Sequence, residues 1–382
     1  MEGKFKLEIN LGSENITEDI KIDVVNNDYS YNNFFNRYLI NNNPVVIKNI
    51  SNWDCIKDWI NEDGINFSYL EEKYGDSPVM IYNCKIPHYN SQKTECTTLR
   101  DYLNSWAKAK DDLLYLKDWH LKNQKPDDNF YRVPIYFASD WLNEYFCECL
   151  KDDYRFVYIG PKNTWTPFHQ DVFSSYSWST NIFGQKKWLL FPPGEELKLL
   201  DNLGNLPYDL EKVDLKNCKY YEIIQESSEA IFIPSGWYHQ VWNLKDSISI
   251  NHNWVNGCNI KMMWKSLCDN LNNVRKEIED CKEMENFEDH CQVMLKASFG
   301  IDLQGFYEML SYIAGKRINL LKNNVEIILF DCYSLGENHA IFDLKCILEI
   351  FELFIQNGFV RFINNKNDCI FELVENIKVW VN

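Results

Sequence analysis

The stretch Asn163-Thr-Trp-Thr-Pro-Phe-His-Gln-Asp171 places a histidine and an aspartate two residues apart. If this stretch is a β-strand, its side chains alternate between two faces, so His169 and Asp171 point to one side and can bind the same metal ion. A third candidate ligand, His239, follows on a later segment. Two imidazoles and one carboxylate on one face of a metal leave its other positions open, which suits a non-haem Fe(II) oxygenase. The His-x-Asp spacing alone is common, so the flanking sequence decides its meaning.

Three further segments extend the pattern: Ser177-Trp-Ser-Thr, Gly184-Gln-Lys-Lys-Trp-Leu-Leu-Phe-Pro-Pro193, and Ile231-Phe-Ile-Pro-Ser-Gly-Trp-Tyr-His-Gln-Val-Trp-Asn-Leu244. Together with the first stretch they resemble the JmjC-domain oxygenases, a branch of the double-stranded β-helix enzymes that use Fe(II) and 2-oxoglutarate. The resemblance spans roughly residues 30 to 256. It is strongest to the JmjC-domain-containing protein 4 group, whose members look like lysyl hydroxylases acting on the eukaryotic translation release factor.

The fold that this resemblance implies is mainly β with helices, an α+β arrangement. Its centre would be a double-stranded β-helix of the cupin-like jelly-roll type, with helices and strands before it and a helical region after it. Between Arg155 and Val255, turn residues separate short apolar stretches, which is typical of an antiparallel barrel or sandwich. We expect a lead-in segment over residues 1–28, a JmjC catalytic domain over 29–256 and a helical C-terminal region over 257–382.

Apolar periodicity predicts individual elements on both sides of the barrel. The expected helices are residues 53–75, 99–110, 259–280, 302–315 and 338–357, with Gly75 and Gly358 as stop signals. Two strands are expected outside the barrel, one directly after Asn43-Pro44 and one at residues 113–117. The C-terminal helices could form dimer contacts or serve only as a covering layer.

By resemblance, His169, Asp171 and His239 are the Fe(II) ligands, with 2-oxoglutarate and O2 as co-substrates. Without the flanking motifs, a buried histidine bonded to a neighbour would be the better interpretation of either imidazole. The distal carboxylate of 2-oxoglutarate needs a buried positive partner. Lys186 lies where JmjC hydroxylases carry such an anchoring lysine. Alternation sends the adjacent Lys187 to the opposite face, although a solvated strand-edge pair would also explain both lysines.

Three more residues are candidates for the co-substrate site. Thr166 matches a threonine that often hydrogen-bonds the co-substrate in this family, and Tyr115 takes the place of a co-substrate tyrosine in related hydroxylases. An ordinary core tyrosine is the alternative interpretation of Tyr115. Asn253 could orient a metal-bound imidazole near His239, because such ligands usually have a hydrogen-bond partner of their own.

His252 is a rival metal ligand, and strand alternation argues against it. In Ser247-Ile-Ser-Ile-Asn-His-Asn-Trp254 the serines and asparagines share one face, while the isoleucines, His252 and the tryptophan share the other. We expect the polar face to look into the barrel, so that His252 packs outside the cavity. The remaining histidines have no ligand-like partner nearby and are expected to be ordinary residues: His88, His120, His290 and His339.

Composition limits the class of protein. With 382 residues, 45% hydrophobic and 15% aromatic, the chain can form a globular core. The formal net charge of −17 disfavours direct nucleic acid binding. It suits a basic protein substrate, or is simply a solvated acidic surface. The thirteen cysteines are irregularly spaced without a Cys-x-x-Cys pair, which indicates reduced thiols rather than a zinc cluster.

Neither a membrane segment nor a secretion signal is evident. No apolar run of about 18 residues appears, and the stretch Met1–Glu8 lacks the apolar segment of a signal peptide. We therefore expect a cytoplasmic, or also nuclear, protein without membrane contact. The sequence leaves the oligomeric state open.

The reaction implied by the resemblance is hydroxylation of a lysine side-chain carbon in the release factor. The metal would carry the oxidation, while protein residues supply coordination, orientation and exclusion of water. No single residue of the sequence selects lysine. Demethylation of N-methyl-lysine and hydroxylation of another protein or of tRNA are alternatives within the same fold. A non-catalytic JmjC scaffold is disfavoured, because the three ligands and Lys186 are all present.

Overall fold

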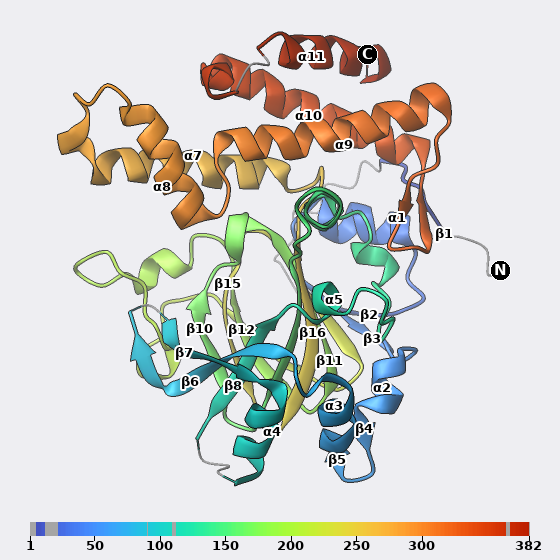
Figure 1. The fold of residues 1–382 in the computed structure, drawn as a ribbon, viewed down its shortest axis with the longest axis vertical. Helices are drawn as coiled ribbons and strands as arrows, with labels where there is room; N and C mark the ends of the chain where they lie inside the picture. The colour runs from blue at the N-terminus through green and yellow to red at the C-terminus, as the bar shows by residue number, and fades with distance from the viewer. Residues whose placement is uncertain (1–4, 12–21, 90, 109–111, 364–366, 382) are drawn as a thin grey trace.

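Two β-sheets form the centre of the structure, a computed structural model that describes residues 5–11, 22–89, 91–108, 112–363 and 367–381 (Figure 1). The larger sheet has nine strands in the order β2-β3-β14-β11-β16-β9-β8-β6-β7, and the smaller has four in the order β10-β15-β12-β13. From β9 to β16 the chain passes back and forth between the sheets, with one hairpin, β12–β13, inside the smaller sheet. This is the connectivity of a jelly roll, and the fold prediction is confirmed.

The strands have the following bounds. Those of the larger sheet are β2 Asp23–Asn26, β3 Val45–Lys48, β14 Glu229–Ile233, β11 Tyr176–Phe183, β16 Ser247–Trp254, β9 Arg155–Gly160, β8 Leu114–Trp119, β6 Pro78–His88 and β7 Ser91–Thr98. Those of the smaller sheet are β10 Trp165–His169, β15 Tyr238–Asn243, β12 Lys186–Phe191 and β13 Tyr221–Gln225. The pairings from β9 to β16 are antiparallel, and only the added strand β2 runs parallel to its neighbour β3.

Aromatic side chains cover the outer face of the larger sheet. Trp178 of β11 is 1% exposed and stacks on Phe137 with ring centroids 5.4 Å apart. Phe232 of β14 and Trp254 of β16 pack against the same ring. Burying a side chain of this size contributes about 1.5–3 kcal/mol, so this face is a core rather than a substrate surface. The opposite face of the sheet is left for the polar residues of the site.

The segment from residue 53 to 75 differs from the single helix predicted for it. It consists of α2 Asp54–Asp58, a two-stranded hairpin of β4 Ile60–Asn61 and β5 Gly64–Ile65, and α3 Phe67–Tyr74. Gly64 has φ +121°, a conformation that favours glycine and closes the hairpin. The predicted helix at 99–110 is confirmed as α4 Leu99–Lys108, and the strand at 113–117 as β8.

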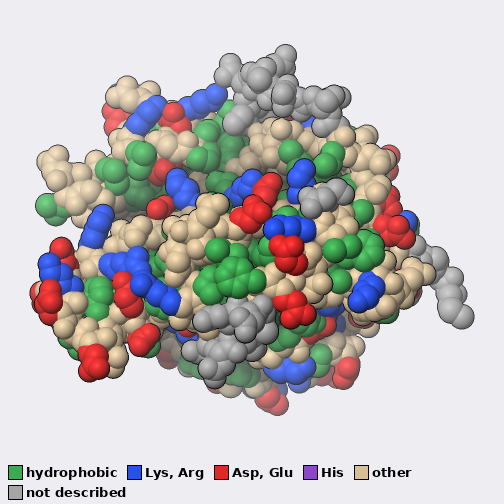
Figure 2. All heavy atoms as spheres, turned by 90° about the horizontal axis from the view of Figure 1, so that it is seen from above, with side chains coloured by type: hydrophobic (Ala, Val, Ile, Leu, Met, Phe, Trp, Pro, Cys, Tyr) green, Lys and Arg blue, Asp and Glu red, His purple; other side chains and the backbone are tan. Residues whose placement is uncertain are grey.

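Helices form a layer over one end of the barrel (Figure 1). They are α7 Ile260–Glu277, α8 Phe287–Phe299, α9 Leu303–Asn323, α10 Glu337–Gln356 and α11 Asn367–Val381. The three predicted C-terminal helices are confirmed as α7, α9 and α10, although α9 is longer than expected. Figure 2 shows the layer from above, with acidic and basic side chains interspersed among apolar ones, so the acidic excess is not gathered on this face. Each described helix is too short or too polar to cross a membrane.

A small sheet joins the N-terminal strand to the C-terminal helical region. β1 Phe5–Leu7 pairs in parallel with β18 Tyr333–Leu335, which also pairs with β17 Ile328–Leu329. The N-terminal segment is therefore tied to the connection between α9 and α10.

A buried ionic cluster fixes the helical layer to the helix α6 (Trp141–Tyr145), which precedes β9. Arg317 of α9 is fully buried and donates two hydrogen bonds to the carboxylate of Glu144, at 2.8 and 2.9 Å. It donates a third, at 2.9 Å, to Asp343 of α10. We call these three residues the Arg317 cluster. Because a buried guanidinium needs partners of opposite charge, the cluster links three helices in one arrangement.

Candidate active site

Three candidate metal ligands meet at one end of the smaller sheet. His169 is the last residue of β10, and His239 is the second residue of β15. The two residues are direct partners in the antiparallel register, and their ring centroids lie 4.3 Å apart. Asp171 completes the group, since one ligand atom from each of the three residues lies within 4.8 Å of the others. The pairing of β10 with β15 thus brings together residues that are far apart in sequence.

Backbone carbonyl groups orient both imidazoles. The Nδ1–H of His169 donates to the carbonyl of Pro167 at 2.7 Å, and the Nδ1–H of His239 donates to that of Trp237 at 3.2 Å. A carbonyl oxygen can only accept, so Nδ1 carries a proton in each ring and Nε2 is the nitrogen that could bind a metal. Burial and the neighbouring His239 lower the pKa of His169 to about 4. His169 is therefore neutral near pH 7, the state in which it can bind a metal.

Asp171 lies just beyond the strand rather than within it. β10 ends at His169 and carries an irregularity between Thr166 and His169, so the prediction that the pair shares one regular strand is wrong in this detail. Asp171 is still extended, with φ −63° and ψ 148°, before the chain turns into a short helix at residues 172–174. The hydroxyl of Ser177 donates to Asp171 Oδ2 at 2.6 Å. This bond holds the carboxylate toward the two imidazoles.

Lys186 is a buried cation without a carboxylate partner. It begins β12, is 2% exposed, and donates to Ser249 Oγ at 2.7 Å and to Tyr115 Oη at 3.3 Å. Over the part of the chain that the structure describes, no carboxylate lies within ion-pair distance of its Nζ. Burial lowers the pKa of Lys186 to about 7. Such an ammonium group is stabilised by an anion, and the carboxylate of a small acid fits this requirement.

The neighbouring Lys187 behaves in the opposite way. It forms an ion pair with Glu222 at 2.8 Å, is one-third exposed, and lies over the ring of Trp242 at 5.9 Å. The alternation of β12 therefore sends the two lysines to different faces, as the sequence predicts.

The other three candidate residues occupy different parts of the site. Tyr115 of β8 is 2% exposed and accepts a hydrogen bond from Lys186, so it lies beside the residue proposed to anchor the co-substrate. Thr166 lies in β10 opposite Val241. Asn253 donates to Ser175 Oγ at 3.1 Å and is the register partner of Ser177, the residue bound to Asp171. Asn253 was expected near His239, and the structure places it on the Asp171 side of the site instead.

His252 lies on the far side of its strand. It is fully buried, shares a hydrogen bond of 2.7 Å with the hydroxyl of Tyr131, and packs on Trp178 with ring centroids 4.3 Å apart. The expectation that it packs outside the site is confirmed. Burial, reinforced by the nearby Arg155, holds its pKa well below the usual value. The polar positions of β16 face inward, as Ser249 demonstrates through its bond with Lys186.

One expectation about the remaining histidines is wrong. His120 lies 2.7 Å from Asp153 and within reach of Asp152, and together they could hold a cation. The other oxygen of Asp153 already accepts from Arg155 at 2.8 Å. This group is therefore a structural ion-pair cluster, which the sequence could not reveal because His120 follows β8 and the two aspartates precede β9, segments that only the fold brings together.

The sequence analysis placed Ser249 on the inward face of β16 without giving it a role, and it missed Ser177, which strand alternation in β11 could have identified. Lys117, Asp118 and Tyr158 also line this region and were missed. The positions of Lys117 and Asp118 depend on a bulge in β8 that no periodicity predicts, whereas Tyr158 lies in regular register with Ser249.

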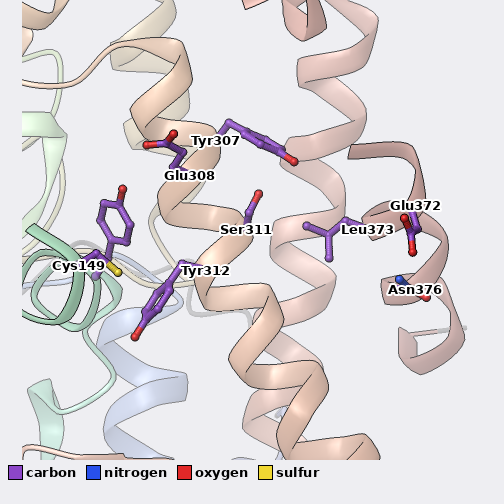
Figure 3. A pocket seen from close by; sticks show the side chains of 9 residues that line it. Cys149, Tyr307, Glu308, Ser311, Tyr312, Glu372, Leu373 and Asn376 are labelled. Carbon is purple, nitrogen blue, oxygen red and sulfur yellow. The ribbon is translucent and has the colours of Figure 1, made fainter. Parts of the chain in front are cut away.

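A separate groove lies within the helical layer (Figure 3). It has a volume of about 570 Å³ and is lined by Tyr145, Cys149, Tyr307, Glu308, Ser311, Tyr312, Glu372, Leu373 and Asn376. Cys149 lies on one side of α9, and Leu373 and Glu372 of α11 lie on the other. The lining residues come from helices, and none belongs to the strands that carry the candidate ligands.

Comparison with known proteins agrees with this geometry. The family described as "Cupin-like domain" matches residues 31–260. A Drosophila melanogaster protein named "2-oxoglutarate and iron-dependent oxygenase JMJD4 homolog" is 48% identical, with 84% of each chain covered. The Homo sapiens protein named "2-oxoglutarate and iron-dependent oxygenase JMJD4" is 42% identical, covering 84% of this chain and 82% of its own. An Arabidopsis thaliana protein named "Arginine-specific demethylase JMJ20" is 34% identical, covering 87% and 78%.

Proposed function

Because this chain belongs to the cupin-like JmjC family of 2-oxoglutarate- and iron-dependent oxygenases, we propose that it hydroxylates a lysine side-chain carbon of a protein. We further propose that the substrate is the eukaryotic translation release factor. The observation that carries the oxygenase chemistry is the combination of three converging ligand atoms with a buried lysine that lacks a carboxylate partner among the described residues. A metal-binding face and an acid-binding group are the two features that such an enzyme needs from its protein.

The residues of the site divide the work. His169 and His239 would hold iron through Nε2 and Asp171 through one carboxylate oxygen, with Ser177 orienting the carboxylate. Lys186 would pair with the distal carboxylate of 2-oxoglutarate, with Tyr115 and Ser249 fixing the direction of its ammonium group. Bound iron supplies the oxidation, in which one oxygen atom of O2 enters a substrate C–H bond and the other enters succinate as 2-oxoglutarate loses CO2.

One observation supports a basic side chain of a protein as the substrate. The chain carries a net charge of −17, which favours a basic partner. The JMJD4 relatives, which match more than four-fifths of its length, support the oxygenase chemistry. The relative named as an arginine-specific demethylase supports a second candidate, oxidation of an N-methyl group. The two reactions differ in which C–H bond is presented to the oxidant.

Incubation with intact release factor, Fe(II), ascorbate and 2-oxoglutarate, followed by mass spectrometry, tests the proposal. We expect one lysine to gain one oxygen atom, with succinate formed in step. His169→Ala should abolish both products, while His290→Ala, on the exposed side of α8, serves as the control. Loss of a methyl group from a methylated arginine peptide, without oxygen gain on lysine, would establish the demethylase instead. No metal-dependent succinate with any protein or peptide would refute both reactions.

A further inference from the structure

Strand β8 carries a bulge beside the candidate active site. Leu116 is paired with Ile159 and Trp119 with Val157, so three steps along β8 correspond to two steps along β9. The extra residue lies at Lys117 and Asp118, and Asp118 has φ +55°. A non-glycine residue in this conformation is strained. A bulge of this kind turns a side chain to the face opposite the one that regular strand alternation would give it. Here the redirected side chain is the carboxylate of Asp118.

Two tyrosines hold that carboxylate. The hydroxyl of Tyr82 donates to Asp118 Oδ2 at 2.6 Å, and the hydroxyl of Tyr158 donates to Oδ1 at 2.6 Å. We call these three residues the Asp118 clasp. All three are partly exposed, and no cation of the described chain lies within ion-pair distance of Asp118. The clasp thus presents a carboxylate oriented by two tyrosine hydroxyl groups, and a carboxylate is a strong acceptor for an organic cation.

The clasp lies on the same face of the larger sheet as the co-substrate anchor. Tyr158 is the register partner of Ser249, which accepts from Lys186, and Lys186 Nζ lies 6.0 Å from the centroid of the Tyr158 ring. Tyr82 is the register partner of Tyr115, the other residue bound to Lys186. Residues directly opposite each other in antiparallel strands point to the same side. The clasp therefore lies on the same inward face of the larger sheet as the residues that contact Lys186.

The same face reaches the strand that carries the metal ligands. Lys117 Nζ donates to Gln92 Oε1 at 3.0 Å, and Gln92 Nε2 donates to the carbonyl of Trp165 in β10 at 3.0 Å. Lys117 also lies 4.2 Å from the centroid of the Tyr82 ring. Burial lowers the pKa of Lys117, against the influence of Asp118, which weakens its competition for the clasp. Lys117, the residue before Asp118, thus connects the clasp through Gln92 to the first residue of β10.

We propose that the Asp118 clasp receives the cationic end of the substrate side chain while its carbon atoms face the metal ligands. This inference rests on the proposed function and supplies a residue that selects a cationic side chain, which the sequence alone did not identify. A carboxylate held by two hydroxyl groups favours an ammonium or guanidinium group over an apolar chain of equal length. The clasp makes Asp118 a specificity residue rather than a group that acts on the metal.

The test compares substrates that differ only in charge. Four peptide pools carry lysine, arginine, norleucine or leucine at a fixed central position in otherwise randomised sequence. Product is measured by mass spectrometry, and binding by calorimetry with Mn(II) and the inert co-substrate analogue N-oxalylglycine. We expect the wild-type protein to prefer a cationic centre over norleucine by about tenfold or more, chiefly through KM and Kd. Asp118→Asn should bring that ratio close to one.

Two further variants control the result. Asp76→Asn makes the same chemical change at a side chain that is 96% exposed, and it should keep the wild-type preference. Tyr82→Phe removes one of the two hydroxyl groups that hold Asp118 and should lower the preference by about threefold. It also serves as the readout if Asp118→Asn does not fold. Unchanged discrimination in the Asp118 variant, or equal binding of lysine and norleucine pools by the wild type, would overturn the inference. Failure of the proposed function has a different signature, the absence of metal-dependent succinate from every pool.

Discussion

Two buried cations, one in the barrel and one in the helical layer, have opposite surroundings. Arg317 is fully buried and donates three hydrogen bonds to the carboxylates of Glu144 and Asp343. Lys186 is 2% exposed and, among the described residues, donates to the hydroxyl groups of Ser249 and Tyr115 and to no carboxylate. The carboxylates around Arg317 neutralise it, because an uncompensated buried charge is costly. The buried Lys117 also lacks a carboxylate, but the amide oxygen of Gln92 binds it. Lys186 has no such amide partner in the described part of the chain, which fits a counter-charge that comes with a ligand.

The largest effect is expected from breaking the paired cation. Arg317→Met removes the guanidinium that the buried carboxylates of Glu144 and Asp343 share and should lower the free energy of unfolding by about 3–5 kcal/mol. Urea denaturation monitored by tryptophan fluorescence measures this loss. Lys316→Met is the matched control, since Lys316 pairs with the same Glu144 but is 25% exposed. That variant should lose less than about 1 kcal/mol. Equal losses in the two variants would mean that burial does not distinguish the pairs.

Replacing the other cation should separate function from stability. Lys186→Met removes the charge that meets the distal carboxylate and should weaken 2-oxoglutarate binding about 100-fold, roughly 3 kcal/mol. The free protein should be as stable as the wild type or more so, because a methionine replaces an ammonium group without a carboxylate partner. Calorimetric titration with 2-oxoglutarate and thermal unfolding measure the two quantities. Lys187→Met, on the exposed face, should change neither by much. A large loss of stability in Lys186→Met would assign this lysine to the fold.

The pH dependence of co-substrate binding tests the same charge. Burial lowers the pKa of Lys186 from its usual range to about 7, so its ammonium form is present in full below that pH. Binding of a carboxylate favours the protonated form, and affinity should be highest below pH 7. It should fall as the pH rises above 7, by up to about tenfold per pH unit. Calorimetry from about pH 6 to about pH 9 measures the slope, and Lys186→Met should lack it.

The lowered pKa of Lys186 also affects the stability of the free protein, and stability should change with pH in the direction opposite to 2-oxoglutarate affinity. The pKa of Lys186 is lower in the folded protein than in the unfolded chain, so folding without co-substrate is penalised while the lysine is charged in both states. This penalty is present in full below pH 7 and disappears as the pH rises toward the ordinary lysine value. Stability of the free protein and its affinity for 2-oxoglutarate should therefore change in opposite directions above pH 7.

The smallest effect is expected at Tyr115. Tyr115→Phe removes a hydroxyl group that accepts from Lys186 at 3.3 Å, a long hydrogen bond. Loss of one neutral contact should weaken 2-oxoglutarate binding by about threefold. Steady-state measurement of its KM checks this value, with kcat at saturation little changed. An effect as large as that of Lys186→Met would show that the tyrosine, and not the lysine, carries most of the binding energy.

Prediction from sequence succeeded where the signal is local. The polar face of β16 and the opposite directions of Lys186 and Lys187 follow from the two-residue period of a strand, and the structure agrees with both. Helices α7, α9 and α10 follow from the spacing of their apolar residues. The single helix predicted for residues 53–75 failed because Gly64, with φ +121°, closes a hairpin within it. At this position the turn that glycine permits decides the local structure, although the apolar spacing around it is typical of a helix.

The sequence by itself determined the jelly roll, its family and the residues that could bind metal and co-substrate. Short motifs and strand alternation depend only on residues that are close together in the sequence, so they can be recognised without the fold. Only the tertiary structure decided how these groups meet. The register of β10 on β15 brings His169 to His239, and the packing of α9 on α6 gives Arg317 its partners. The bulge in β8 aims Asp118 at Tyr82 and Tyr158. Each of these depends on contacts between distant segments, which no local pattern encodes, and it is such contacts that leave one buried cation paired and the other ready for a ligand.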